Sequence, residues 1–194
     1  MATPVARLTR LLLIAPLITL LMACSDYQTA RRAYEVGRFT EALQLLEKLA
    51  REGDARAQYE VALMYLQGIG TPINPSRGGE WMLAAANNGN ATAMVEIGGR
   101  YENGVNAEKS FILAFTWYRR AALIGDSIGC YKLAMMYESG EGIPQDLPRA
   151  YAWFRLAKST AGKIAASRVW NKMTPSDREL ADRLYDLLDK NPEA

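Results

Sequence analysis

Apolar positions recur along this chain in a pattern that repeats every 36 residues between residues 54 and 162. Three residue types keep this spacing: Tyr65, Tyr101 and Tyr137; Gly68, Gly104 and Gly140; and Trp81, Trp117 and Trp153. A fixed period of this length is typical of proteins that are built as a stack of similar units. We therefore divide this segment into three units, at residues 54–89, 90–125 and 126–162.

Within each unit the pattern predicts two helices. In the first unit, Ala57, Val61 and Tyr65 have the spacing of one helical face. A side chain that can accept hydrogen bonds from a helix start precedes both helices in every unit. These residues are Asp54, Asn90 and Asp126 for the first helices, and Asn74, Ser110 and Asp146 for the second helices. Glycine follows each first helix, where a left-handed residue is usual, so each unit is predicted to be helix, turn, helix, turn.

Bulky and small residues alternate along the second helices. The pairs Ala85-Ala86 and Ala121-Ala122 each lie four residues after a tryptophan. Neighbouring helices can approach closely where a small residue faces a large ring, so we expect the tryptophans to be buried against such positions. Truncation of a buried tryptophan costs about 3–5 kcal/mol. We expect Trp117, in the middle unit, to be the least tolerant of the three.

The second unit carries most of the motif of a known repeat. Its residues are Ala93, Ile97, Gly98, Tyr101, Gly104, Ser110, Ala114, Trp117, Tyr118, Ala121, Ala122 and Gly125. This motif resembles the Sel-one-like (Sel1-like) repeat, a relative of the tetratricopeptide repeat. The resemblance implies an all-α fold, a right-handed α–α superhelix (solenoid) of helix-pair repeats that holds other proteins. Gly78, Asn106 and Lys158 depart from the motif.

The segments on either side of these units differ from them. Residues 24–53 are predicted to form a divergent, tetratricopeptide-like first repeat, because Tyr34, Gly37 and Phe39 have the spacing of its turn. Residues 163–194 are predicted to form C-terminal capping helices, since terminal repeats need a cover.

The last of these helices is expected to begin with Thr174 as its cap and Pro175 at its first position. Its apolar stripe consists of four leucines: Leu180, Leu184, Leu187 and Leu188. We favour a lid over the repeat end for this helix, with a membrane-binding or partner-binding helix as the alternative.

Residues 1–23 have the pattern of a signal peptide. Arg7 and Arg10 precede an apolar run that is too short for a membrane span of about 20 residues. The end of the run, Leu-Met-Ala-Cys, resembles a bacterial lipobox, which implies cleavage before Cys24 and lipidation of that residue. With Ser25 next, the resemblance implies a protein anchored by lipid in the outer membrane and facing the periplasm. The alternative is an ordinary secretory signal peptide with a coincidental cysteine.

Charge and composition exclude several functions. Removal of Arg7 and Arg10 leaves 21 of the 23 basic residues against 21 acidic ones, so the chain has no electrostatic attraction for nucleic acid. The chain has no histidine, the commonest general base and a frequent zinc ligand. Cys130 would be the only free thiol, and its place on a helix favours a packing role. We expect no enzymatic activity, no cofactor and no metal.

The first helices suggest a surface for a partner. In repeats of this type they line the concave side, where Tyr59, Leu63, Val95, Tyr131 and Met135 lie between the packing positions. We interpret these residues as a candidate partner-binding groove. The alternative is that neighbouring repeats bury these side chains, because helical stripes are more often core than site.

The resemblance therefore implies a lipid-anchored envelope scaffold that binds partner proteins through a helical-repeat groove. Proteins with this layout are similar to assembly or regulatory factors of envelope machines, including those for exopolysaccharide secretion. An alternative from another class is a module that binds the cell wall or a polysaccharide directly, because aromatic residues on an open groove suit sugars.

Overall fold

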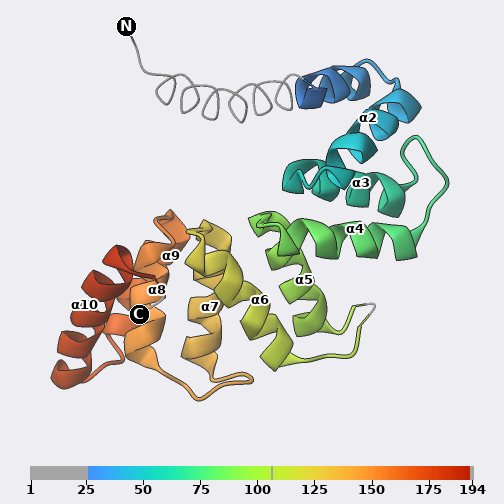
Figure 1. Cartoon of the computed structure of the whole chain (residues 1–194). Coiled ribbons are helices and arrows are strands. Elements are labelled where there is room, and N and C mark those ends of the chain that lie inside the picture. Colours follow the sequence, from blue (N-terminus) through green and yellow to red (C-terminus); the bar gives the residue numbers. More distant parts are fainter. Residues whose placement is uncertain (1–25, 106, 193–194) are drawn as a thin grey trace, which may run out of the picture. The chain divides into compact units, whose positions relative to one another are not determined.

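The computed structural model describes residues 26–105 and 107–192, and these residues form helices and turns without any strand (Figure 1). They belong to two compact units, which divide after Asn88. In the first unit, a helix at residues 26–35 is followed by three more: α2 (Phe39–Arg51), α3 (Ala55–Gln67) and α4 (Pro75–Asn87). The second unit contains α5 (Ala91–Asn103), α6 (Phe111–Leu123), α7 (Ser127–Ser139), α8 (Leu147–Leu156), α9 (Thr160–Trp170) and α10 (Pro175–Lys190).

The predicted caps begin six of these helices. The Asn90 side chain accepts a hydrogen bond from the backbone N–H of Ala93 at 2.9 Å, and Ser110 accepts one from Leu113 at 3.3 Å. Asp54, Asn74, Asp126 and Asp146 cap their helices in the same way. Each cap satisfies a backbone donor that has no partner within its helix, which fixes the helix start.

The turn between the two helices of each 36-residue repeat is held by one recurring backbone hydrogen bond. The N–H of the second cap donates to the carbonyl of the tyrosine in the first helix, with N–O distances of 2.8–2.9 Å for Asn74–Tyr65, Ser110–Tyr101 and Asp146–Tyr137. Gly68, Gly104 and Gly140 precede these turns with φ between 70° and 76°, as the prediction of a left-handed residue required.

The largest fully buried side chain of each second helix lies one residue after the tryptophan. Met82, Tyr118 and Phe154 are spaced by 36 residues and are completely inaccessible to solvent. The prediction that the tryptophans are buried holds for Trp153, which is 5% exposed, but it is wrong for Trp117, which is only half-buried and has the Arg120 guanidinium 4.3 Å from its ring centroid. The expectation that Trp117 is the least tolerant of the three stays a prediction.

Tyr118 shows how a bulky side chain packs on a small one. A Cβ atom added to Gly98 would lie 2.6 Å from the Tyr118 ring, so α5 and α6 can be this close only because Gly98 has no side chain. The Tyr118 hydroxyl donates to Glu102 Oε2 at 2.7 Å, which satisfies its polar end.

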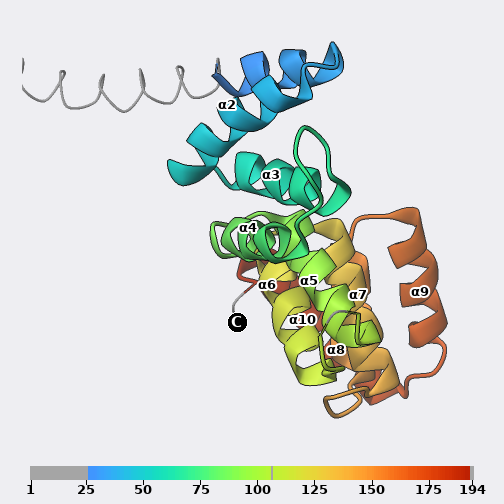
Figure 2. The same ribbon diagram turned by 90° about the vertical axis from the view of Figure 1, so that its right-hand side faces the viewer.

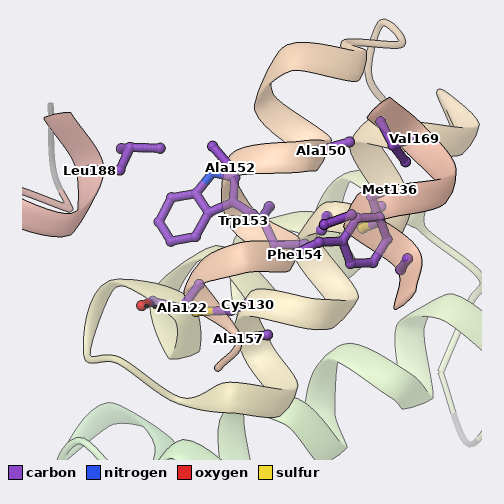
Figure 3. Close-up of a cluster of buried hydrophobic side chains, with 14 of the residues drawn as sticks. Ala122, Cys130, Met136, Ala150, Ala152, Trp153, Phe154, Ala157, Val169 and Leu188 are labelled. Carbon is purple, nitrogen blue, oxygen red and sulfur yellow. Dashed lines mark hydrogen bonds between the residues drawn. The ribbon is translucent and has the colours of Figure 1, made fainter. Parts of the chain in front are cut away.

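The core of the second unit is shared by several helices. It surrounds Trp153 and Phe154 of α8, and Figure 3 shows Leu188 of α10 on the Trp153 side and Val169 of α9 on the Phe154 side. The first unit has a core of its own, from the helix at residues 26–35 and from α2 and α3, whose buried members include Ala33, Leu46, Leu49, Val61 and Tyr65.

Two helices, α9 and α10, occupy the C-terminal part of the chain; α9 begins at Thr160, before the predicted boundary at residue 163, and α10 packs along α8. Thr174 and Asp177 make a reciprocal capping box, and Pro175 is the first helical residue. The predicted stripe differs in part from the buried face, because Ala181 and Leu188 are buried, whereas Leu180 and Leu187 are 43% and 49% exposed. Since Leu184 and Tyr185 also pack on the core, the face that covers α8 is shifted toward Tyr185.

The 36-residue register continues into α9. Ala165, Ala166 and Val169 are buried at the positions that Gly129, Cys130 and Leu133 occupy in α7. The helix α9 therefore has the packing face of a first helix. Trp170 falls where the earlier first helices have Ala62, Gly98 and Ala134, so the small residue at this position has been replaced by a large ring.

Gly70, in the turn between α3 and α4, provides a test of how closely the backbone packs in the first compact unit. A Cβ on Gly70 would lie 2.6 Å from the backbone carbonyl of Phe39, and the φ of Gly70 is +70°. We expect Gly70→Ala to lower the free energy of unfolding by about 2–4 kcal/mol, since it adds a collision with backbone to left-handed strain.

Gly53→Ala is the matched control, because Gly53 also has a positive φ, +95°, but nothing lies within 4 Å of its added Cβ. Gly53→Ala should lower the free energy of unfolding only by the cost of the left-handed strain, about 1–2 kcal/mol. The measurement is urea unfolding of both variants, and equal losses would show that the contact between Gly70 and Phe39 is unimportant.

Candidate functional site

The five predicted groove residues all lie on first helices. Tyr59 and Leu63 are on α3 in the first unit, whereas Val95 on α5 and Tyr131 and Met135 on α7 belong to the second unit. Met135 is 39% exposed, and the other four are half-buried. The prediction that these residues form one partner-binding groove remains a prediction, and each unit is described in turn.

In the first unit, Tyr59 and Leu63 line a hollow of about 150 Å³. Its other lining residues are Arg31, Tyr34, Glu60, Met64, Gln67 and Ile69. Glu60 fixes one wall, because its carboxylate accepts from the Tyr27 hydroxyl at 2.6 Å and from the Arg31 guanidinium at 3.2 Å. The lining of the hollow thus combines apolar side chains with the ion pair between Arg31 and Glu60.

In the second unit, packing takes up part of the predicted strip. Val95 and Tyr131 pack against the hydrophobic core, and the Tyr131 ring meets Phe154 edge to face at 5.2 Å between centroids. Such contacts stabilise the repeat stack. Met135 is the member of this group that offers the most surface, and its part in a groove stays a prediction.

Carboxylates at two matching positions of the second compact unit connect one repeat to the next. Glu102 accepts from Lys132 Nζ at 3.0 Å, and Glu138, 36 residues later, accepts from Lys172 Nζ at 2.8 Å and from Arg168 Nε at 3.1 Å. Lys132 and Arg168 are also 36 residues apart. Each ion pair spans 30 or more residues and therefore fixes the register of one repeat against its neighbour.

The surroundings of Glu102 favour its charged form. Burial alone would raise the pKa of Glu102, but hydrogen bonds from Tyr118 and Lys132 outweigh it, so the pKa lies below its ordinary value. The same pair has the opposite effect on the phenol, because burial and the hydrogen bond to the Glu102 carboxylate raise the pKa of Tyr118. The tyrosine therefore remains a neutral donor.

A larger hollow, of about 460 Å³, lies between α8 and α9. Seven residues line it: Tyr151, Arg155, Lys163, Ala166, Ser167, Trp170 and Asn171. The sequence analysis did not identify this site. The sequence signal that could have pointed to it is Trp170, a large ring at a position where the other repeats have glycine or alanine.

The thiol and the possible metal ligands of the described residues can be considered in turn. Cys130 is buried, and burial raises the pKa of its thiol to about 11, which makes it a poor nucleophile. No cluster of acidic, cysteine or histidine side chains suited to a metal ion occurs within 26–105 and 107–192. Within the same residues, no helix is both long and apolar enough to cross a membrane. Cys24 lies outside the described residues.

The repeats identify the family. The Sel1 repeat profile matches residues 31–54, 55–90, 91–126 and 127–159, which is more than half of the chain. The chain belongs to the Sel1 repeat family, and the predicted fold, an all-α superhelix of helix-pair repeats, is confirmed. Sel1 repeat proteins are in general scaffolds for protein interaction, and enzymatic activity is not typical of them.

Solved structures agree with this assignment. The chain is 32% identical to a Sel1 repeat protein from Oxalobacter formigenes, with a TM-score of 0.62 over 66% of this chain and 97% of that one. It has the fold of a protective antigen from uropathogenic Escherichia coli strains that displays an SLR fold, with 22% identity, a TM-score of 0.65, and coverage of 76% of this chain and 33% of that one. None of the curated proteins matches the chain significantly.

The low pKa of Glu102 predicts how stability changes with pH. A carboxyl group whose pKa is lower in the folded state stabilises the fold above its unfolded pKa, here the ordinary value of 4.5, and loses this contribution as the pH falls through the folded pKa. We expect Glu102→Gln to lower the free energy of unfolding by about 1–2 kcal/mol at pH 7.

That difference between the variant and the unmodified chain should shrink below pH 4.5, as measured by urea unfolding across a pH series. Glu108→Gln removes the same charge from an exposed carboxylate and serves as the control. A Glu102→Gln effect that is independent of pH would contradict an electrostatic origin.

Proposed function

We propose that this protein is a lipid-anchored scaffold of the bacterial cell envelope, which binds partner proteins through the surface of its first helices. The observation that carries the proposal is the combination of a lipobox-like sequence ending at Cys24 with Sel1 repeats that begin only seven residues later, at residue 31. A short tether of this kind would hold the repeats close to a bilayer. Ser25 after Cys24 supports outer-membrane sorting, with the repeats in the periplasm.

The contact surface is proposed from the first helices. Tyr59 and Leu63 line the hollow of the first unit, and Met135 leaves a large part of its side chain exposed in the second. Val95 and Tyr131 would contribute only the parts of their side chains that are not packed on the core. Apolar and aromatic side chains of this kind are the usual anchors of protein interfaces, which supports a protein partner over a sugar.

The anchor is tested by replacing the lipidated cysteine. We expect Cys24→Ser to move the protein from the membrane fraction to the soluble fraction, because the acyl chains supply the membrane affinity. In a density gradient, the unmodified protein should sediment with outer membranes.

Cys130→Ala is the control, since it removes the buried thiol and leaves the lipidation site intact. It should stay in the membrane fraction. Membrane retention of Cys24→Ser would contradict the lipid anchor.

The contact surface is tested by a double variant, Tyr59→Ala with Met135→Ala. Its capture of envelope proteins, identified by crosslinking and mass spectrometry, should fall at least about tenfold for the specific partner. Both residues are partly exposed, so the fold should persist, which circular dichroism checks.

The matched control is Leu83→Ala with Ile112→Ala, which truncates two exposed apolar residues on the second helices α4 and α6. Equal capture by both double variants would exclude the first-helix surface. Retention of the unmodified protein on purified peptidoglycan without any protein present would replace the scaffold by the cell-wall-binding alternative.

A further inference from the structure

The last helix does not pair as the earlier second helices do. In the preceding repeats each first helix packs against the helix that follows it: α3 with α4, α5 with α6, and α7 with α8. In contrast, α9 and α10 both pack against α8, and Figure 2 shows α9 set apart from the other helices of this unit. One side of α9 is therefore left without a helix from the described part of the chain, and the hollow between α8 and α9 opens there.

The size of this hollow is that of a ligand site. Its volume of about 460 Å³ lies within the range of roughly 300–1,000 Å³ that is usual for pockets that bind small molecules or side chains. Tyr151 and Trp170 form its aromatic part, with ring centroids 4.9 Å apart and an angle of 40° between the rings. Ser167 and Asn171 add polar groups on the α9 side.

The charged residues that line the hollow are basic, and the Asp182 carboxylate of α10 lies next to two of the lining residues, Arg155 and Tyr151. Arg155 from α8 and Lys163 from α9 line it, and none of the seven lining residues is acidic. Arg155 is held in place by Asp182 of α10, at 3.4 Å, and by the Tyr185 ring, whose centroid is 3.8 Å from the guanidinium carbon. Lys163 is exposed and has no ion pair with any described residue, so its ammonium group is available to a ligand.

The arrangement of the rings favours a carboxylate over a stacked sugar. The guanidinium groups of Arg155 and Arg178 lie over Tyr151 and Trp170, at 5.6 Å and 5.3 Å from the ring centroids. Part of each aromatic face is thus already used, whereas a sugar needs an open face. Ring edges carry partial positive charge and, together with the two cations, attract an anionic group.

We propose that the hollow between α8 and α9 binds an acidic segment of a protein partner, with a glutamate or aspartate carboxylate held by Lys163 and Arg155. The apolar stem of that side chain would contact the edges of Tyr151 and Trp170. This site extends the proposed scaffold function and rests on it only in that the ligand is a protein. It uses different residues from the first-helix surface, so each can fail without the other.

The test uses the full chain in a non-ionic detergent and a defined probe, hexaglutamate, with hexaglutamine as its uncharged counterpart. Binding is followed by calorimetry and by the indole N–H signal of Trp170 in nuclear magnetic resonance spectra, which Trp170→Phe identifies. Hexaglutamate should shift that signal and should bind more weakly as salt is added. Hexaglutamine should leave the signal unchanged.

Charge reversal of the lysine supplies the matched comparison. Lys163→Glu should weaken hexaglutamate binding by at least about tenfold, the usual value of one hydrogen bond to a charged group. Lys190→Glu makes the same change at an exposed position near the end of α10, away from the hollow, and should leave the affinity within about twofold.

Several results would overturn the proposal. Equal binding to the Lys163→Glu and Lys190→Glu variants would show that the probe binds elsewhere. Equal binding of hexaglutamine would remove the role of charge, and tighter binding of oligogalacturonate would replace the acidic peptide with an acidic sugar. A Trp170 signal that shifts with protein concentration alone would assign the hollow to contacts between copies of this chain.

Discussion

The packing of a large side chain against a residue with little or no side chain determines the spacing of the helices in each repeat. Tyr118 shows this most clearly, because its ring occupies the space that a Cβ on Gly98 would need. Its hydroxyl then reaches Glu102, and Glu102 in turn holds Lys132 of the next repeat. One buried ring thus connects α5, α6 and α7 through both packing and charge. Because repeat proteins derive their stability from contacts between neighbours, a change at this ring affects the repeats on both sides.

Local features of the fold could be predicted from the sequence, because local chemistry determines them. A cap such as Asn90 acts on the backbone of Ala93, three residues away, and needs no tertiary information. The period of 36 residues could not distinguish Trp117 from Tyr118, since both positions recur with the same spacing. Which one is buried depends on the direction from which α5 approaches, and Gly98 determines that direction. Similarly, the leucine spacing of α10 is compatible with more than one buried face. Ala181 is buried and Leu180 is exposed because of the way α10 packs on α8.

The candidate surfaces were also predictable only as far as they depend on local sequence and not on how neighbouring helices pack. The position of Tyr59 and Met135 on first helices follows from the repeat, and both retain accessible surface. Tyr131 has an equivalent position, but its ring is drawn onto the core by Phe154, a residue of the following helix. The hollow beside α9 depends on a non-local event, the packing of α10 on α8, which no spacing in the sequence encodes. Only Trp170, at a position that is otherwise small, hinted at a change.

The packing of α10 also explains how the array of repeats can end. A further repeat would need α9 to present a small residue to its own second helix, as Gly98 does to Tyr118. Trp170 removes that possibility, and the Arg178 side chain of α10 donates a hydrogen bond to the Trp170 carbonyl. Covering α8 buries Ala181 and Leu188, so the end of the core is closed. As a consequence, no second helix packs on one side of α9 within the described residues. A hollow lined by charged and aromatic side chains can therefore remain open there.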